Sequence, residues 1–224
     1  MHKIRYVDSH TGGEPTRVVL DGFPDLGDRP LSLAQRVDAL RAGCDHFRAA
    51  AASEPRASDV MVGALLMPPV EATSVASVIY FNRVGYLGMG GHGTIGLIAT
   101  LQYLGRITPG VHRVDTPVGT VRCTLQPDGK VSIQNIPAWR YRKAVTVNVD
   151  GVGPVSGDVA WGGNWFFLAD AGNRSLIPDN VEALLDFSRA IRRALAAQNV
   201  TGPHDEEVDH IELFGAPSDA SRDS

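Results

Sequence analysis

The chain has 224 residues, of which 43% are hydrophobic and 21% are charged, and its formal net charge at pH 7 is −4. This length and composition predict a globular protein, and the absence of Lys or Arg runs argues against nucleic acid or an anionic membrane as partner. No stretch reaches the roughly 18 apolar residues of a membrane span, and the first residues do not resemble a signal peptide. We therefore expect a cytoplasmic protein that acts on a small molecule.

Short segments of alternating apolar residues between turn residues predict strands in most of the chain. These are residues 4–7, 16–20, 60–66, 74–80, 112–115, 118–125, 131–136, 144–149 and 165–169. Helical spacing of apolar residues predicts helices over 32–51, 92–104 and 180–198. Because few strands alternate one-for-one with helices, we expect a mostly antiparallel α+β fold. Cys44 then falls mid-helix and Cys123 in a strand, and both are interpreted as packing residues without a disulfide.

An internal repeat relates two parts of the chain. Gly12-Gly13, the strand at 16–20 and the helix at 32–51 have counterparts in Gly162-Gly163, the strand at 165–169 and the helix at 180–198. The offset of about 150 residues predicts two related halves. Polar residues beside the first glycine pair could fix its turn, so we leave them out of the predicted catalytic set. These are Asp8, His10, Thr11 and Glu14.

A glycine-rich loop precedes the second predicted helix. Residues 85–96 read GYLGMGGHGTIG and contain six glycines. Glycine allows close backbone approach, so the amides of Gly90, Gly91, His92 and Gly93 can converge at a helix N-terminus, which favours an anion such as a carboxylate or phosphate. The alternative is a turn that only lets a strand and a helix pack closely.

The same loop matches a dinucleotide-binding fingerprint in its letters, Gly88-x-Gly90-x-x-Gly93. That reading requires a parallel strand after the helix, ending in an acidic residue. Instead, Asp115 leads into the turn sequence DTPVGT and a hairpin-like pair of strands. The dinucleotide interpretation is therefore disfavoured.

Five segments carry a resemblance to a known family. They are DSHTGGEPTR (8–17), GYLGMGGHGTIGL (85–97), DTPVGTV (115–121), SGDVAWGGNWFFL (156–168) and DHIELFGAP (209–217). In this order they resemble the proline racemase family, and within it most closely the 4-hydroxyproline 2-epimerases. The resemblance implies a diaminopimelate-epimerase-like α+β fold of two pseudo-symmetric domains, each with a mostly antiparallel sheet around a central helix. We expect a first domain at 1–115, with its central helix near 92–104, and a second at 116–224.

The chemistry that the resemblance implies is a cofactor-independent, metal-free isomerisation. Family members invert Cα of hydroxyproline or proline by two-base proton transfer, with donors that neutralise the carboxylate. Their first loop reads Met-Cys-Gly-His, whereas this chain reads Met89-Gly90-Gly91-His92. Gly90 thus occupies the position of the first catalytic cysteine. The resemblance assigns Gly91 and His92 to the substrate carboxylate and His210 to the substrate pocket.

The family pattern continues beyond residue 217 into a second cysteine and a second central helix. The resemblance therefore implies that residues 116–224 form an incomplete second domain and that this chain is impaired or inactive as an epimerase. Two other interpretations stay open: a non-catalytic remnant that only binds an imino acid, and the branch that dehydrates trans-3-hydroxyproline. Pairing as a homodimer also stays open.

Overall fold

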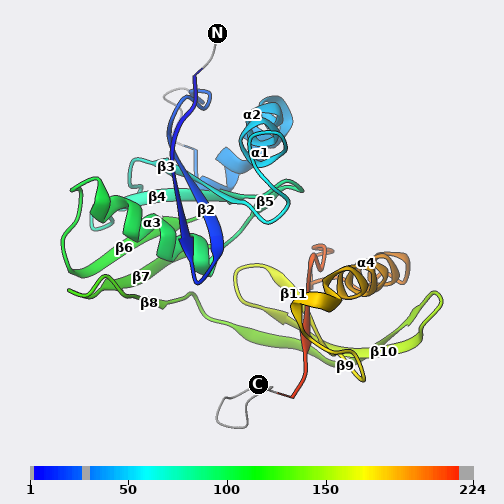
Figure 1. The fold of residues 1–224 in the computed structure, drawn as a ribbon. Helices are drawn as coiled ribbons and strands as arrows, with labels where there is room; N and C mark the ends of the chain where they lie inside the picture. The colour runs from blue at the N-terminus through cyan, green and yellow to red at the C-terminus, as the bar shows by residue number, and fades with distance from the viewer. Residues whose placement is uncertain (1–2, 27–30, 217–224) are drawn as a thin grey trace. The chain divides into compact units, whose positions relative to one another are not determined.

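The computed structural model describes residues 3–26 and 31–216 and divides the chain into two compact units, Met1–Ile136 and Pro137–Ser224 (Figure 1). The sequence instead places a boundary after residue 115, which lies inside a strand. The difference arises because the three strands between residues 110 and 134 pair within the sheet of the first unit.

The first unit is built on one sheet, in which β1 to β4 are followed by β6, β7 and β8, with β5 paired to β4. The strands are β1 (Arg5–Thr11), β2 (Glu14–Asp21), β3 (Val62–Met67), β4 (Ala76–Phe81), β5 (Tyr86–Leu87), β6 (Gly110–Thr116), β7 (Gly119–Leu125) and β8 (Val131–Gln134). Most neighbours are antiparallel, as predicted, while β2 with β3 and β4 with β6 run parallel. The β4–β6 pairing corrects the expectation that no parallel strand follows the helix, although it spans only two residue pairs.

The helix α3 (Gly91–Tyr103) is the central helix of this unit. It contacts β1, β2 and β3 and also β8, so strands from both ends of the sheet meet the same helix and the sheet curls around it (Figure 1). Its buried Leu97, Ile98 and Leu101 belong to one core with Val18 and Tyr80 of the sheet. The helix predicted at 92–104 is thus present and enclosed.

Two further helices, α1 (Leu33–Gly43) and α2 (Asp45–Ala52), share a second core with the opposite face of this sheet. Neighbouring strand residues divide between the cores: Val18 belongs to the α3 core and Val19 to this one. The sequence predicts one helix over 32–51, but the backbone breaks at Cys44, where φ is −137° and ψ is 17°. Cys44 therefore lies at a helix junction and not mid-helix.

The second unit has a four-stranded sheet in the order β12, β11, β10, β9. Its elements are β9 (Trp139–Val149), β10 (Gly153–Trp161), β11 (Trp165–Asp170), the 3-10 helix η1 (Pro178–Asn180), α4 (Val181–Ala197) and β12 (His210–Phe214). Phe187, Ile191 and Leu195 of α4 share a core with sheet residues that include Val147 and Phe167. β10 is absent from the sequence prediction because Gly153, Pro154 and Gly157 in its sequence are typical of turns.

The predicted repeat appears in how the elements are connected. In the first unit, a hairpin of β1 and β2 leads through α1 and α2 to β3, which lies parallel to β2. In the second, a hairpin of β10 and β11 leads through α4 to β12, which lies parallel to β11. Gly12-Gly13 and Gly162-Gly163 fall between the strands of the two hairpins.

All three tryptophans of the chain lie in the second unit and form one aromatic cluster. The Trp161 and Trp165 ring centroids are 5.1 Å apart, and the Trp139 ring lies 5.7 Å from that of Trp161. None of the described helices combines the length and apolar character that a bilayer span needs.

Candidate functional site

The glycine loop ends at the N-terminus of α3, where Gly90 is the N-cap residue. The first helical hydrogen bond runs from the Thr94 amide to the Gly90 carbonyl oxygen at 2.9 Å. The amides of Gly91, His92 and Gly93 precede that bond and so have no partner inside the helix. Because the helix dipole adds partial positive charge at this end, the loop suits a carboxylate.

The backbone at Gly90 does not require glycine. Its φ of −141° and ψ of 114° are extended values that any residue adopts. A Cβ built there would lie 3.6 Å from the Tyr80 ring, an ordinary van der Waals contact. The site therefore has room for a side chain that Gly90 does not supply. At Gly91, a Cβ would meet nothing within 4 Å, so the loop is open on that side.

Tyr80 supports the first turn of α3 from inside the core. Its hydroxyl lies 2.7 Å from Thr94 Oγ1, and Thr94 Oγ1 donates to the Gly90 carbonyl oxygen at 2.7 Å. Thr94 has a single hydroxyl proton, so Tyr80 is the donor in the first of these bonds. Burial raises the pKa of Tyr80 far above its ordinary value, which keeps this donor protonated.

The β1–β2 hairpin holds the same helical turn from another side. Thr11 Oγ1 donates to the His92 carbonyl oxygen at 3.2 Å, and the Gly13 amide donates to His10 Nδ1 at 3.3 Å. Thr11 was not among the predicted site residues, although the polar residues around the Gly12-Gly13 pair were a usable signal. The structure places Thr11 against the glycine loop as a positioning contact.

His210 lies in β12 of the second unit, whereas Gly90, Gly91 and His92 lie together in the first. Asp209 Oδ1 is 2.7 Å from His210 Nδ1, and the Phe166 ring centroid is 4.9 Å from that of the imidazole. A carboxylate at Nδ1 favours the tautomer that carries its proton there, which leaves Nε2 as an acceptor.

Both cysteines are free thiols outside the glycine loop. Burial raises the pKa of Cys123 to about 11, so this thiol stays neutral within the core of the first unit. Within residues 3–26 and 31–216, no cluster of three or more His, Cys, Asp or Glu side chains is placed to hold a metal ion.

The Asp115 carboxylate is hydrogen-bonded to other groups of the same chain. Its carboxylate accepts hydrogen bonds from the amides of Val70 and Glu71 and from the hydroxyls of Ser74 and Thr120, at 2.7 to 3.0 Å. A dinucleotide fold needs an acidic side chain that can accept from the ribose hydroxyls. The buried hydrogen bonds of Asp115 give that interpretation no support.

A family model described as proline racemase matches residues 6–224. The 4-hydroxyproline 2-epimerase of Pseudomonas aeruginosa is 56% identical over 214 residues, which cover 96% of this chain and 68% of that relative. The enzyme of the same name from Burkholderia ambifaria is 54% identical over 224 residues, or 100% of this chain and 71% of that relative.

Two crystal structures share the fold. A probable proline racemase from Agrobacterium radiobacter, with bound carbonate, has a TM-score of 0.88 at 20% identity and covers 96% of this chain and 68% of its own. A hydroxyproline epimerase from Agrobacterium vitis, with bound trans-4-hydroxy-L-proline, has a TM-score of 0.82 at 21% identity over 93% and 64%. These matches confirm the predicted fold class. The chain belongs to the proline racemase family.

Proposed function

We propose that this chain is an isomerase of the 4-hydroxyproline 2-epimerase type and that it binds the substrate carboxylate through the amides of Gly91 and His92. The observation that carries the proposal is the open glycine loop, whose amides have no partner inside the helix. It occurs in a chain 56% identical to a named 4-hydroxyproline 2-epimerase. The substrate class is therefore an imino acid.

Inversion requires the Cα–H bond of the substrate to break while its electron pair delocalises into the carboxylate. Amide donors and the helix dipole at the loop stabilise the charge that develops there, and no cofactor enters this step. The proton must pass to a base on one face and return from an acid on the other. Gly90 has no side chain to act as that base, so we propose that the chain as it stands is impaired in this step.

We further assign His210 to substrate recognition. Residues 209–217 resemble the family segment that carries a pocket histidine, and Asp209 fixes the imidazole through Nδ1. Nε2 then remains to accept a hydrogen bond from the substrate.

The proposal is tested by exchange of the substrate Cα proton with solvent, because exchange requires only one base. We expect Gly90→Cys to incorporate deuterium from D2O into trans-4-hydroxy-L-proline about 10²–10⁴-fold faster than the unchanged chain, followed by proton NMR. Gly90→Ala is the matched control, since it adds the Cβ without a thiol. Equal rates for the cysteine and alanine variants, with no binding of pyrrole-2-carboxylate, would contradict the proposal.

A non-catalytic imino-acid binder is the second candidate, and the unfilled side-chain position at Gly90 is the observation that favours it. Calorimetry with proline, 4-hydroxyproline and pyrrole-2-carboxylate distinguishes the two. Saturable binding without deuterium incorporation by Gly90→Cys would favour the binder. Formation of a dehydrated product from trans-3-hydroxyproline would instead favour the dehydratase branch.

We also propose that the protein is cytoplasmic and that it forms a homodimer. The composition supports the first, and light scattering coupled to size exclusion tests the second.

A further inference from the structure

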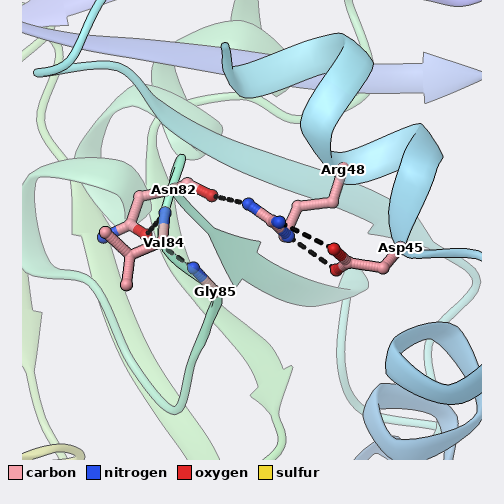
Figure 2. A network of polar contacts seen from close by, with 5 residues as sticks. All are labelled: Asp45, Arg48, Asn82, Val84 and Gly85. Carbon is pink, nitrogen blue, oxygen red and sulfur yellow. Dashed lines mark hydrogen bonds and ion pairs between the residues drawn. The ribbon is translucent and has the colours of Figure 1, made fainter.

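Arg48 of α2 is a buried cation whose hydrogen bonds reach the turn between β4 and β5, at the start of the glycine loop. Its side chain is 9% exposed, and its Nε and Nη2 atoms bind the two carboxylate oxygens of Asp45, each at 2.7 Å (Figure 2). This bidentate pairing lowers the pKa of Asp45 and keeps its carboxylate charged. The remaining contact runs from Nη1 to the Asn82 carbonyl oxygen at 2.7 Å.

Asn82 organises a tight turn directly after β4. Its side-chain Oδ1 accepts from the amides of Val84 and Gly85 at 2.8 and 3.0 Å (Figure 2). Its own amide donates to the Gly85 carbonyl oxygen at 2.8 Å. The turn at 82–85 is therefore a hydrogen-bonded unit, and Arg48 fixes it to α2.

This turn is the entry to the glycine loop. It leads into β5, which pairs back onto β4 with Leu87 opposite Tyr80, and then into residues 88–90 and α3. No side-chain hydrogen bond caps α3 at Gly90. The loop is fixed at its far end by Tyr80 and Thr94, and at its near end by the turn that Arg48 holds.

We infer that Arg48 is a positioning residue for the carboxylate-binding amides, acting through Asn82 and the 82–85 turn. The Arg48 guanidinium is buried while the Asp45 carboxylate is half-exposed, so the ion pair holds a buried cation in place and leaves its Nη1 directed at the turn. The identity of the ligand in this inference rests on the proposed function, whereas the control of loop geometry does not.

Two sequence steps allow the loop to be observed directly. Met89-Gly90 is the only Met-Gly step in the chain, and His92-Gly93 is the only His-Gly step. Protein labelled with carbonyl-¹³C methionine or histidine together with ¹⁵N glycine therefore gives one NMR signal each for the Gly90 and Gly93 amides, which flank the carboxylate-binding amides of Gly91 and His92. We would record both signals in the unchanged chain, in Arg48→Met and in Arg48→Lys, with and without pyrrole-2-carboxylate.

Arg17 provides a matched control within the same unit. Its side chain is 5% exposed and makes a bidentate pair with Asp8, but its other hydrogen bonds go to the carbonyl oxygens of Ala51 and Arg56. Arg17→Met thus removes a similarly buried arginine and its ion pair without touching the 82–85 turn. Urea unfolding of each variant measures the accompanying loss of stability.

We expect Arg48→Met to shift both amide signals in the free protein and to weaken pyrrole-2-carboxylate binding by about tenfold or more, as misplaced recognition groups do. Arg48→Lys should recover part of both effects, because it keeps the charge. Arg17→Met should lower the unfolding midpoint while leaving both signals and the affinity unchanged.

Unchanged signals in Arg48→Met would overturn the inference, and the proposed function would stand if the unchanged chain still bound the probe. Shifted signals in Arg48→Met, with no binding by the unchanged chain, would support the positioning role and overturn the carboxylate assignment. If Arg48→Met fails to fold, Asn82→Ala replaces it, because that change removes the turn acceptor and keeps the ion pair. It is expected to move the Gly90 signal, and an unmoved signal overturns the inference.

Discussion

Two glycines in the first half of α3 differ in what surrounds them. A Cβ at Gly96 would lie 2.9 Å from Thr16 Cβ and 3.0 Å from Ser9 Oγ, where the helix crosses the β1–β2 hairpin. A Cβ at Gly91 would meet nothing within 4 Å. Packing therefore requires glycine at position 96, whereas the open surface at position 91 leaves that amide accessible.

Gly96→Ala is expected to destabilise the chain by about 1–2 kcal/mol, because overpacking against the hairpin outweighs the gain in helix propensity. Urea unfolding measures the effect. Gly91→Ala in the same helix is the control and should be neutral or slightly stabilising. Equal stabilities for the two variants would show that the hairpin yields to the added methyl group.

At the scale of elements, Asp115 ties the segment after β3 to β6. The carboxylate in β6 accepts from two backbone amides, at Val70 and Glu71, and from the hydroxyls of Ser74 and Thr120. Burial acts to raise the pKa of Asp115, but these hydrogen bonds outweigh it, and the pKa lies below its ordinary value. The ionised carboxylate is thus the form that holds this segment in place.

The lowered pKa of Asp115 gives a signed prediction for stability. The carboxylate stabilises the fold above its unfolded pKa of about 3.9, and this contribution is lost as pH falls through the folded pKa. Asp115→Asn should cost about 2–3 kcal/mol at pH 7, because an amide cannot satisfy all of the donors, and the deficit should shrink toward pH 3. Urea unfolding at both pH values measures it.

Asp128→Asn is the control for that experiment. The pKa of Asp128 is also lowered, chiefly by its hydrogen bond with Lys130, but its side chain is exposed to solvent. Its replacement should leave the unfolding free energy nearly unchanged at both pH values. A deficit for Asp115→Asn that did not depend on pH would contradict the role given to its charge.

Elements with a continuous apolar pattern were predictable from sequence, whereas a break in the backbone or a glycine within a strand was not. The helix predicted at 92–104 is α3 at Gly91–Tyr103. The break at Cys44 was missed because the apolar pattern continues through it. β10 was missed because Gly157 is typical of a turn, whereas here a Cβ would lie 2.7 Å from the Leu168 carbonyl oxygen and glycine is needed for packing.

The candidate site also has a part that was predictable from sequence and a part that was not. Gly90, Gly91 and His92 are adjacent in sequence, so the loop was found from its composition. The contacts that hold it join distant residues: Thr11 and His92 are 81 positions apart, and Arg48 and Asn82 are 34 apart. Only the packing of the hairpin against α3, and of α2 against the opposite face of the sheet, brings them together.

At the scale of the molecule, the two units have separate cores and separate spectroscopic reporters. All three tryptophans lie in the second unit, and Cys123 is buried in the core of the first. Intrinsic fluorescence therefore reports on the second unit, and the reactivity of the Cys123 thiol reports on the first. The two signals can be followed in one sample.

We expect the units to unfold in separate transitions, as multidomain chains do. In a Cys44→Ala background, Asp115→Asn should shift the urea midpoint of Cys123 thiol exposure to lower concentration and leave the tryptophan transition in place. The Cys44→Ala chain without the second change is the control. A joint shift of both transitions would show instead that the two units unfold cooperatively.

The space beside Tyr80 at position 90 also has a genetic consequence. A glycine codon that ends in a pyrimidine is a single base change away from a cysteine codon. The extended backbone at Gly90 and the ordinary 3.6 Å contact of an added Cβ with Tyr80 mean that Gly90→Cys would strain neither the backbone nor the Cβ position. A single base change could therefore introduce a thiol at position 90, which under the proposed function would supply the base that Gly90 lacks.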